Sequence, residues 1–256
     1  MDALEARIAA LEAKLAKVTA DADNVYITGA NLHVRSGSGA TNGAINGKGN
    51  LIVGYNESGG ELRTGSHNLI IGPSHTYTSY GGLVAGLGNS ITGPNSSVSG
   101  GLANTASGFG SSVSGGGSNI ATGYCASVSG GDSNKANLQF TSVSGGAYNT
   151  ASSISASVSG GSNNTASGFF SSVSGGNYNI ASGSTSSISG GINNIASGIN
   201  VSISGGDSNT ASGISTSVSG GTYNTASDVF TSVSGGSNRT ASNRFDWAAG
   251  GLWQDQ

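Results

Sequence analysis

Charged side chains are scarce in this chain of 256 residues. Asp, Glu, Lys and Arg together make up 8% of it, and the formal net charge is only -3. Nucleic acids and anionic lipid surfaces are recognised through clustered Lys and Arg. We therefore expect no nucleic-acid partner and no attraction to an anionic membrane.

Long apolar runs and cysteine are scarce too. No run approaches the roughly 20 apolar residues that cross a bilayer, so we expect no membrane insertion. The N-terminus lacks the basic start and apolar core of a secretory signal, which leaves the export route open. Cys125 is the only cysteine, so no intrachain disulfide forms, and we expect a weakly buried thiol rather than a reactive or metal-bound one.

Catalytic and metal-binding sets do not stand out either. Asp and Glu total 12, and those in the repeats, such as Asp132 and Asp207, occupy variable turn positions. There are no obvious paired carboxylates, Ser-His-Asp set or phosphate-binding glycine loop. His67 and His75 lack a third ligand at metal-binding spacing, so we expect hydrogen-bonded surface or turn residues. We predict a protein that is not an enzyme and binds no cofactor or metal.

Glycine, in contrast, is abundant, with 46 residues, and much of it belongs to a fifteen-residue repeat. Each copy has Val or Ile between two Ser, then Gly-Gly, and Ala eight residues after the Val or Ile. That apolar position recurs at Val98, Val113, Val128, Val143, Val158, Val173, Ile188, Ile203, Val218 and Val233. A fixed period of this kind is typical of one structural unit stacked on itself.

Each repeat is predicted to form two short strands and two turns. Because strand side chains alternate, Val98 should point inward between two outward Ser, and Ala106 should point inward in the second strand. Stacked copies then predict an all-β, parallel β-solenoid over residues 81–246. We expect the Asn column from Asn104 to Asn224 to form a ladder of hydrogen bonds along one turn.

The core of such a solenoid should be thin. One Val and one Ala per coil bury little apolar area against the entropy of ordering fifteen residues. Large apolar residues meanwhile recur at outward positions, with Ile180 and Ile195 before Ala, and Phe109 and Tyr124 at one turn. Exposed apolar columns favour a partner surface, so we predict self-association.

Residues 1–19 are predicted to form a coiled-coil helix for oligomerisation. Its apolar residues follow alternating steps of three and four, and the seam comprises Leu4, Ile8, Leu11, Leu15 and Val18. Asp2 is the expected N-cap, with Glu5 reaching back to it. The helix alone does not decide between two and three strands. The alternative is an amphipathic helix lying over one end of the solenoid.

Residues 20–80 are predicted to form an irregular β shoulder with loop insertions. Strands are expected at 50–54, 68–72 and 82–86, the last with Leu83 in the position of Val98. Strands covered on both faces read as continuous apolar runs. We therefore expect Ile52 and Ile70, at positions where later copies carry Ser, to face another chain or layer.

Five tyrosines are candidate surface-binding residues, because they lie in loops or at variable positions of the repeats. They are Tyr77, Tyr80, Tyr148, Tyr178 and Tyr223. At the other end, residues 247–256 keep the register with Ala248 in the Val position, while Trp247 and Trp253 replace small residues. We predict a cap there, with a Trp-lined binding tip as the alternative.

The repeat resembles the head repeats of YadA-like trimeric autotransporter adhesins, Ser-Val-Ala-Ile-Gly-x-x-Ser-x-Ala-x-Gly. Val98, Gly101, Ala106 and Gly108 match that pattern, whereas Gly100 replaces an Ile and the family repeat is typically one residue shorter. The resemblance implies a left-handed parallel β-roll, three chains side by side and a coiled-coil stalk. Here the helix precedes the repeats, an order that resembles a phage-like tail fibre attached by its N-terminus.

The leading functional hypothesis is a non-enzymatic homotrimeric fibre, extracellular at a cell surface or on a virion. It would act as a scaffold and adhere to a host-surface glycan or protein. One alternative is an ice-binding solenoid that uses a Thr-x-Ser ladder such as Thr105 and Ser107, although Lys135 and Asn137 interrupt it. The other alternative is a passive structural spacer.

Overall fold

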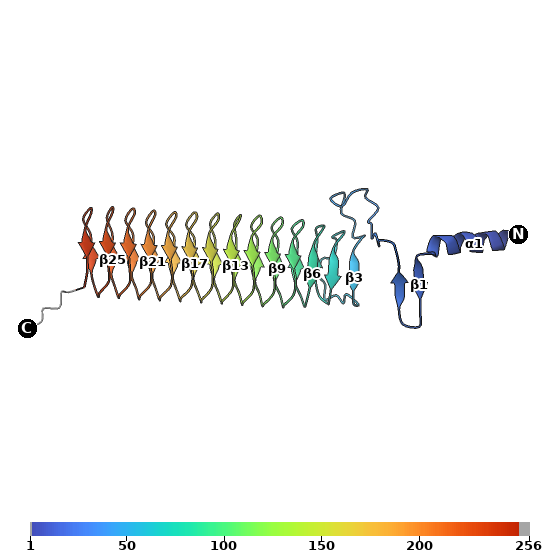
Figure 1. Cartoon of the computed structure of the whole chain (residues 1–256), viewed down its shortest axis with the longest axis horizontal. Coiled ribbons are helices and arrows are strands. Elements are labelled where there is room, and N and C mark those ends of the chain that lie inside the picture. Colours follow the sequence, from blue (N-terminus) through green and yellow to red (C-terminus); the bar gives the residue numbers. More distant parts are fainter. Residues whose placement is uncertain (1, 251–256) are drawn as a thin grey trace, which may run out of the picture. The chain divides into compact units, whose positions relative to one another are not determined.

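The computed structural model describes residues 2–250, which divide into a first unit ending at Arg35 and a second unit starting at Ser36 (Figure 1). The first unit contains helix α1 (Ala3–Leu15) and the antiparallel hairpin β1 (Val18–Ala20) and β2 (Val25–Ile27). The second unit is a parallel β-solenoid. Mostly β structure, one short helix and fifteen-residue coils confirm the predicted fold class.

Helix α1 begins as expected but ends three residues early. The backbone N–H of Asp2 donates to Glu5 Oε2 at 3.0 Å, the returning half of the capping box. The helix ends at Leu15, and Val18 pairs with Ile27 in the hairpin. Val18 therefore does not belong to the helix seam. Its β-branched side chain suits the strand, and the turn that follows draws the chain into the hairpin.

The hairpin turn is organised by Asp21. Its Oδ1 accepts the backbone N–H groups of Asp23 at 3.1 Å and Asn24 at 2.8 Å, and its Oδ2 accepts the Tyr26 hydroxyl at 2.8 Å. The Tyr26 bond, followed by the backbone bond from Asp23, lowers the pKa of Asp21 below its ordinary value of 3.8. The same bond raises the pKa of Tyr26.

The solenoid consists of a 14-stranded and a 12-stranded parallel sheet, which we call the larger and the smaller sheet. In spatial order the larger sheet contains β3 (Leu51–Val53), β4 (Leu69–Ile71), β6 (Leu83–Ala85), β8 (Ser97–Val98), β10 (Ser112–Val113), β12 (Ser127–Val128), β14 (Ser142–Val143), β16 (Ser157–Val158), β18 (Ser172–Val173), β20 (Ser187–Ile188), β22 (Ser202–Ile203), β24 (Ser217–Val218), β26 (Ser232–Val233) and β28 (Trp247–Ala248).

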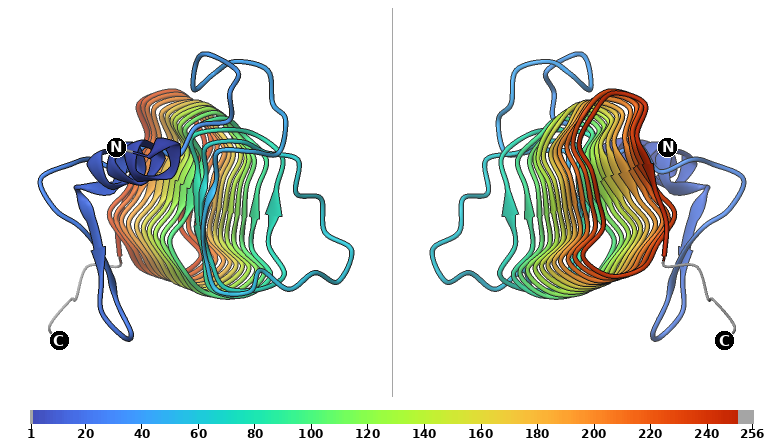
Figure 2. Two further views of the ribbon diagram at one scale, coloured as in Figure 1. Left: turned by 90° about the vertical axis from the view of Figure 1, so that its right-hand side faces the viewer. Right: turned by 90° about the vertical axis from the view of Figure 1, so that its left-hand side faces the viewer.

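The smaller sheet is built from the second strand of each coil. It contains β5 (Thr76–Tyr77), β7 (Ser90–Ile91), β9 (Thr105–Ala106), β11 (Ile120–Ala121), β13 (Lys135–Ala136), β15 (Thr150–Ala151), β17 (Thr165–Ala166), β19 (Ile180–Ala181), β21 (Ile195–Ala196), β23 (Thr210–Ala211), β25 (Thr225–Ala226) and β27 (Thr240–Ala241). Seen along the solenoid, the successive coils superimpose (Figure 2).

The two coils from Ile70 to Val98 have a shorter period than the regular coils, whereas Ile52 pairs with Ile70 eighteen residues later. From Val98 on, each inward Val or Ile pairs with the one fifteen residues later, but Ile70 pairs with Val84 and Val84 with Val98, steps of fourteen. Leu83 is therefore opposite Ser97, and its expected place in the Val98 position is wrong by one residue. The apolar run at 83–85 allowed either register, and burial of Val84 decided it.

Ile52 and Ile70 are in the Val column as well, not at the Ser positions as predicted. Ile70 is 0% exposed in the core of its own chain, so it does not face another chain. Ile52, which pairs with it at the end of the sheet, is 43% exposed, and its contact with another chain stays a prediction. The outward positions are those next to Ile52 in β3, where Leu51 and Val53 are exposed. A one-residue shift turns every side chain of a strand to the other face.

The core is broader than one Val and one Ala per coil. As predicted, Val98 and Ala106 point inward and recur in columns, and so does Asn104. A further inward column lies two residues before the Val column. It comprises Ser96, Ser111, Ala126, Thr141, Ala156, Ser171, Ser186, Val201, Thr216 and Thr231. In this column Ser111 Oγ donates to the carbonyl of Gly108 at 2.8 Å. Thr216 Oγ1, in the same column, is buried without a hydrogen-bond partner.

Candidate functional site

Two turns of each coil carry the side chains that could meet a partner. We call residues 100–104, and their equivalents in other coils, the Asn turn, because the chain passes there from the larger to the smaller sheet and ends on the buried Asn. We call residues 107–111, and their equivalents, the apolar corner, where the chain returns to the larger sheet. Both turns contain a residue with positive φ, such as Ala103 at 55° and Gly110 at 62°.

The Asn turn is held by the predicted ladder. The Asn104 N–H donates to Asn89 Oδ1 in the preceding coil at 2.7 Å, and Asn104 Nδ2 donates to Gly100 O in its own coil at 3.2 Å and to Gly116 O in the next at 2.9 Å. Each Asn thus ties three coils together in the buried interior. This confirms the ladder and explains why the side chain is Asn, which both donates and accepts.

His75 occupies the first position of that ladder. Its Nδ1 accepts the N–H of Asn89 at 3.1 Å, and its Nε2 donates to Ile71 O at 3.0 Å, just as Asn104 Nδ2 bonds the carbonyl four residues before it. A fixed donor and a fixed acceptor set the neutral tautomer with its proton on Nε2. His75 is hydrogen-bonded, as expected, but it is fully buried. Counting fourteen residues back from Asn89 would have placed it there.

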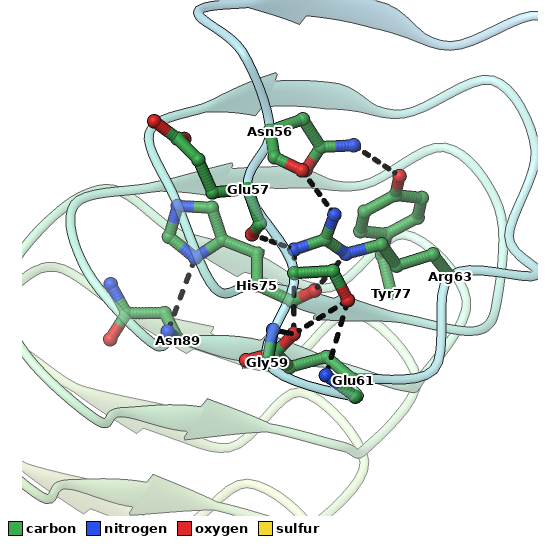
Figure 3. A network of polar contacts seen from close by, with 10 residues as sticks. Asn56, Glu57, Gly59, Glu61, Arg63, His75, Tyr77 and Asn89 are labelled. Carbon is green, nitrogen blue, oxygen red and sulfur yellow. Dashed lines mark hydrogen bonds and ion pairs between the residues drawn. The ribbon is translucent and has the colours of Figure 1, made fainter.

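The loop before β4 folds onto these first coils around Arg63 (Figure 3). The Arg63 guanidinium donates to the carbonyls of Asn56 and Glu57, and its Nε donates to His75 O at 3.3 Å. An ion pair joins Arg63 to Glu61 at 3.5 Å. Backbone N–H bonds, its own and that of Gly59, lower the pKa of Glu61. The insertion is thus held to the first coils by Arg63, while Asn56 Oδ1 is buried without a hydrogen-bond partner.

Tyr77 is not a surface residue, so that prediction is wrong. It points inward from β5 in the column of Ile91 and Ala106, is 3% exposed, and its hydroxyl accepts Asn56 Nδ2 at 3.0 Å. In this column Tyr77 and Ile91 are large side chains, whereas the coils from Ala106 on have Ala. Tyr80 is half-buried and bridges Ser66 of the preceding coil.

Tyr148, Tyr178 and Tyr223 are exposed on the Asn turn, each with φ between 55° and 57°. They share one turn of the solenoid but lie two and three coils apart. They are therefore separate exposed rings along the solenoid and do not form one continuous patch. Asp132 and Asp207 lie on the same turn in intervening or flanking coils. This side of the solenoid is therefore mixed, with rings, amides and carboxylates.

The apolar corner is different, because nearly every coil places an exposed aromatic or aliphatic side chain there. The exposed members are Phe109, Tyr124, Leu138, Phe140, Phe169, Phe170, Ile199, Ile214, Phe230 and Phe245. Phe109 stacks on Tyr124 with ring centroids 5.3 Å apart, and Phe230 stacks on Phe245 at 5.5 Å. Cys125 is on this corner and is exposed, so its expected burial is wrong.

The helix presents a second uncovered apolar stripe. Leu4, Ile8, Leu11 and Leu15 are all exposed, and no residue of α1 is buried. A helix of 13 residues is marginal in water unless an apolar face is packed. The seam residues are brought together on one face, as the spacing predicts.

At the C-terminal end, Trp247 pairs with Ser232 and Ala248 with Val233, which is the expected register. Trp247 is exposed, and its Nε1 donates to Ser234 Oγ at 2.6 Å. Trp253 and the rest of the predicted cap lie outside the described residues.

Within residues 2–250 no three His, Cys, Asp or Glu residues are grouped to hold a metal ion, and no helix has the length and apolarity to cross a membrane. β-Solenoids are typically structural repeat proteins, in which each coil contacts its neighbours. Comparisons with protein-family models and with curated proteins gave no match.

Proposed function

We propose that this protein is a non-enzymatic, homotrimeric fibrous protein of a cell surface or a virion tail, with the solenoid as a rigid scaffold. The single observation that carries the proposal is the exposed seam of α1, where Ile8 and Leu11 have no cover. The seam spacing matches coiled-coil packing, and Arg7 and Glu12 are placed to pair between chains. The helices of a second and a third copy of the chain would cover this seam.

The resemblance to YadA-like head repeats supports three chains rather than two. The fourteen-residue coils from Ile70 to Val98 have the length of that family's repeat. Leu51 and Val53 of β3 and Ile71 of β4 are exposed and form a further apolar surface on the outer face of these strands. Membership of that family is part of the proposal.

Light scattering on the full chain tests the assembly. We expect the mass of a trimer, about three times 24.8 kDa. The double variant Ile8→Lys/Leu11→Lys should lower the mass, because it places charges in the seam. The matched variant Ala6→Lys/Ala13→Lys adds the same charges on the opposite face of α1 and should remain trimeric. A monomeric wild-type chain, or equal masses for the two variants, would contradict the proposal.

For adhesion we propose the Asn turn, with Tyr148, Tyr178 and Tyr223 contacting a host-surface glycan or protein. Exposed aromatic rings beside amides are the usual contacts of such ligands. Glycan-array binding by the full chain should be lost in Tyr148→Ala/Tyr178→Ala/Tyr223→Ala. It should persist in Asn163→Ala/Asn193→Ala/Asn238→Ala, which changes the same turn position in other coils. Absence of any bound glycan or surface protein would favour the passive spacer.

An ice-binding role is the second candidate, supported by the outward Thr side chains of β9, β15 and β17, which lie on one parallel sheet. Ile120 and Lys135 interrupt that file between β9 and β15. A thermal-hysteresis measurement separates the two functions, because a fibre that only supports or adheres should produce none.

A further inference from the structure

The apolar corner has side chains that its own fold does not require. Phe140, Phe170 and Phe230 have φ between 55° and 60°, a strained region that bulky residues seldom adopt. Other coils fill the same position with residues that suit it better, such as Gly110 and Asn200. The backbone at these three positions is therefore strained, and because the rings are exposed, burial within the chain does not offset that strain.

The corner also lacks charge over most of its length. From 107–111 to 212–216, no Asp, Glu, Lys or Arg occurs in this turn, whereas the Asn turn carries Asp132 and Asp207. An uncharged apolar strip can pack against a copy of itself without like-charge repulsion. This favours a second copy of the chain over a charged partner surface.

The distribution of side chains along the corner favours copies aligned in register. Nearly all coils contribute a ring or an aliphatic group, but Ser184 and Thr185 leave one polar gap between Phe170 and Ile199. In a parallel, in-register assembly that gap faces its own copy, and each apolar group faces an apolar group. Any shift by one coil would place Ser184 and Thr185 against rings or isoleucines.

We propose that the apolar corners of the three copies lie against one another along the trimer axis, in register over the uncharged coils from Phe109 to Ile214. This inference rests on the proposed homotrimer and adds which surface forms it. Parallel alignment follows from a coiled coil at the N-terminus of each copy. Like residues of the copies then meet at the same height, so Cys125 of each copy lies near Cys125 of the next.

Oxidative cross-linking of the full chain with diamide tests this contact through the natural thiol. Two Cys125 thiols would lose two protons and two electrons to diamide and form one disulfide between copies. We expect a covalent dimer on a non-reducing gel that dithiothreitol reverses. The matched control Cys125→Ser/Ser118→Cys moves the thiol to the Asn turn, at an exposed position with nearly the same φ, 54° against 52°. It should give no cross-link.

A second comparison uses stability. Phe140→Ser/Phe170→Ser/Phe230→Ser places Ser where Ser155 and Ser215 already stand, so each chain should still fold. We expect the trimer to melt several degrees lower than the wild type. Tyr148→Ser/Tyr178→Ser/Tyr223→Ser makes the same change on the Asn turn and should melt like the wild type.

The outcomes separate this inference from the proposed function. A monomer in light scattering overturns both. A trimer that cross-links through Ser118→Cys and not through Cys125, or through neither, overturns the packing of the apolar corners and leaves the trimer standing. Equal melting of the two triple variants also overturns it. A dimer band with Cys125 alone, together with the lower melting of the Phe variant, supports it.

Discussion

At the scale of residues, the two glycines of each Gly-Gly pair have different roles. Gly146 has φ 81°, and a Cβ there would overlap the carbonyl of Gly161 in the next coil and Asn149 Nδ2. Gly145 has open space around its Cβ position. The fourteen-residue coil from Val84 to Val98 has Gly86 in the role of Gly101 and no equivalent of Gly100. The first glycine of the pair is thus the additional residue that makes the later coils fifteen residues long instead of fourteen.

Substitution of the two glycines should therefore give unequal effects. Gly146→Ala should destabilise the solenoid by about 1–3 kcal/mol or more, through a positive φ and a clash with backbone. Gly145→Ala, its neighbour and control, should stay within about 0.5 kcal/mol of the wild type. Denaturant unfolding followed by circular dichroism measures both. Similar losses for the two variants would contradict these separate roles.

His75 offers a second test at this scale. His75→Asn should fold and keep the wild-type stability within about 1 kcal/mol, because Asn makes the same pair of bonds in the coils from Asn89 to Asn224. His75→Leu should lose about 1–3 kcal/mol, since it leaves the Asn89 N–H and the Ile71 carbonyl unpaired in the core. Thermal melting of the two variants is the measurement. If Leu were tolerated as well as Asn, the ladder would not extend to this coil.

At the scale of elements, the hairpin β1–β2 depends on the ionised carboxylate of Asp21. Its pKa is lowered in the folded chain, so the stabilisation is complete above about 3.8, the ordinary value, and is lost as pH falls through the folded pKa. Tyr26 makes the largest contribution to this shift.

Tyr26→Phe should therefore raise the pKa of Asp21 toward its ordinary value, while the bond from Asp23 keeps part of the shift. The measurement is an NMR pH titration of the Asp21 carboxyl carbon in chain labelled at Asp. The wild-type chain, measured under the same conditions, is the control. An unchanged Asp21 titration would show that the Tyr26 bond does not form in solution.

At the scale of the whole molecule, the solenoid is a one-dimensional stack. Each strand of the regular part pairs only with strands one coil before and after it. Stability in such a stack is close to a sum of coil and interface contributions. Whole coils should therefore be removable, whereas fractions of a coil should not.

Deletion of residues 143–157 joins Ser142 to Val158 and preserves every column, so the shortened chain should fold and melt within a few degrees of the wild type. Deletion of 143–150 joins Ser142 to Ala151, removes half a coil and places an Ala strand against the Val column. It should melt well below the full-coil deletion. Circular dichroism melting compares the two. Equal stability would mean that the columns do not set the register.

The sequence by itself determined the repeat architecture. A fifteen-residue period, Ser-Val-Ser alternation and an unbroken Asn column were sufficient to predict two parallel strands per coil, the inward Val and Ala columns and the ladder, because these features are local and are repeated from coil to coil. The inward column of Ser96 was not predicted from them. The capping box and seam of α1 followed from helix geometry in the same way.

Only the tertiary structure decided the register of the first coils and the fate of single side chains there. Strand 69–71 is apolar at every position, so its pattern could not predict which residue points inward. Ile70 points inward because it pairs with the buried Val84 in the next coil. Tyr77 is buried because it stacks in the column of Ala106, and His75 because it stacks in the column of Asn104. Both columns combine a fourteen-residue step with a fifteen-residue step, so the regular fifteen-residue period alone does not place these two residues. Cys125, by contrast, is exposed because its positive φ places it on the corner, away from the core.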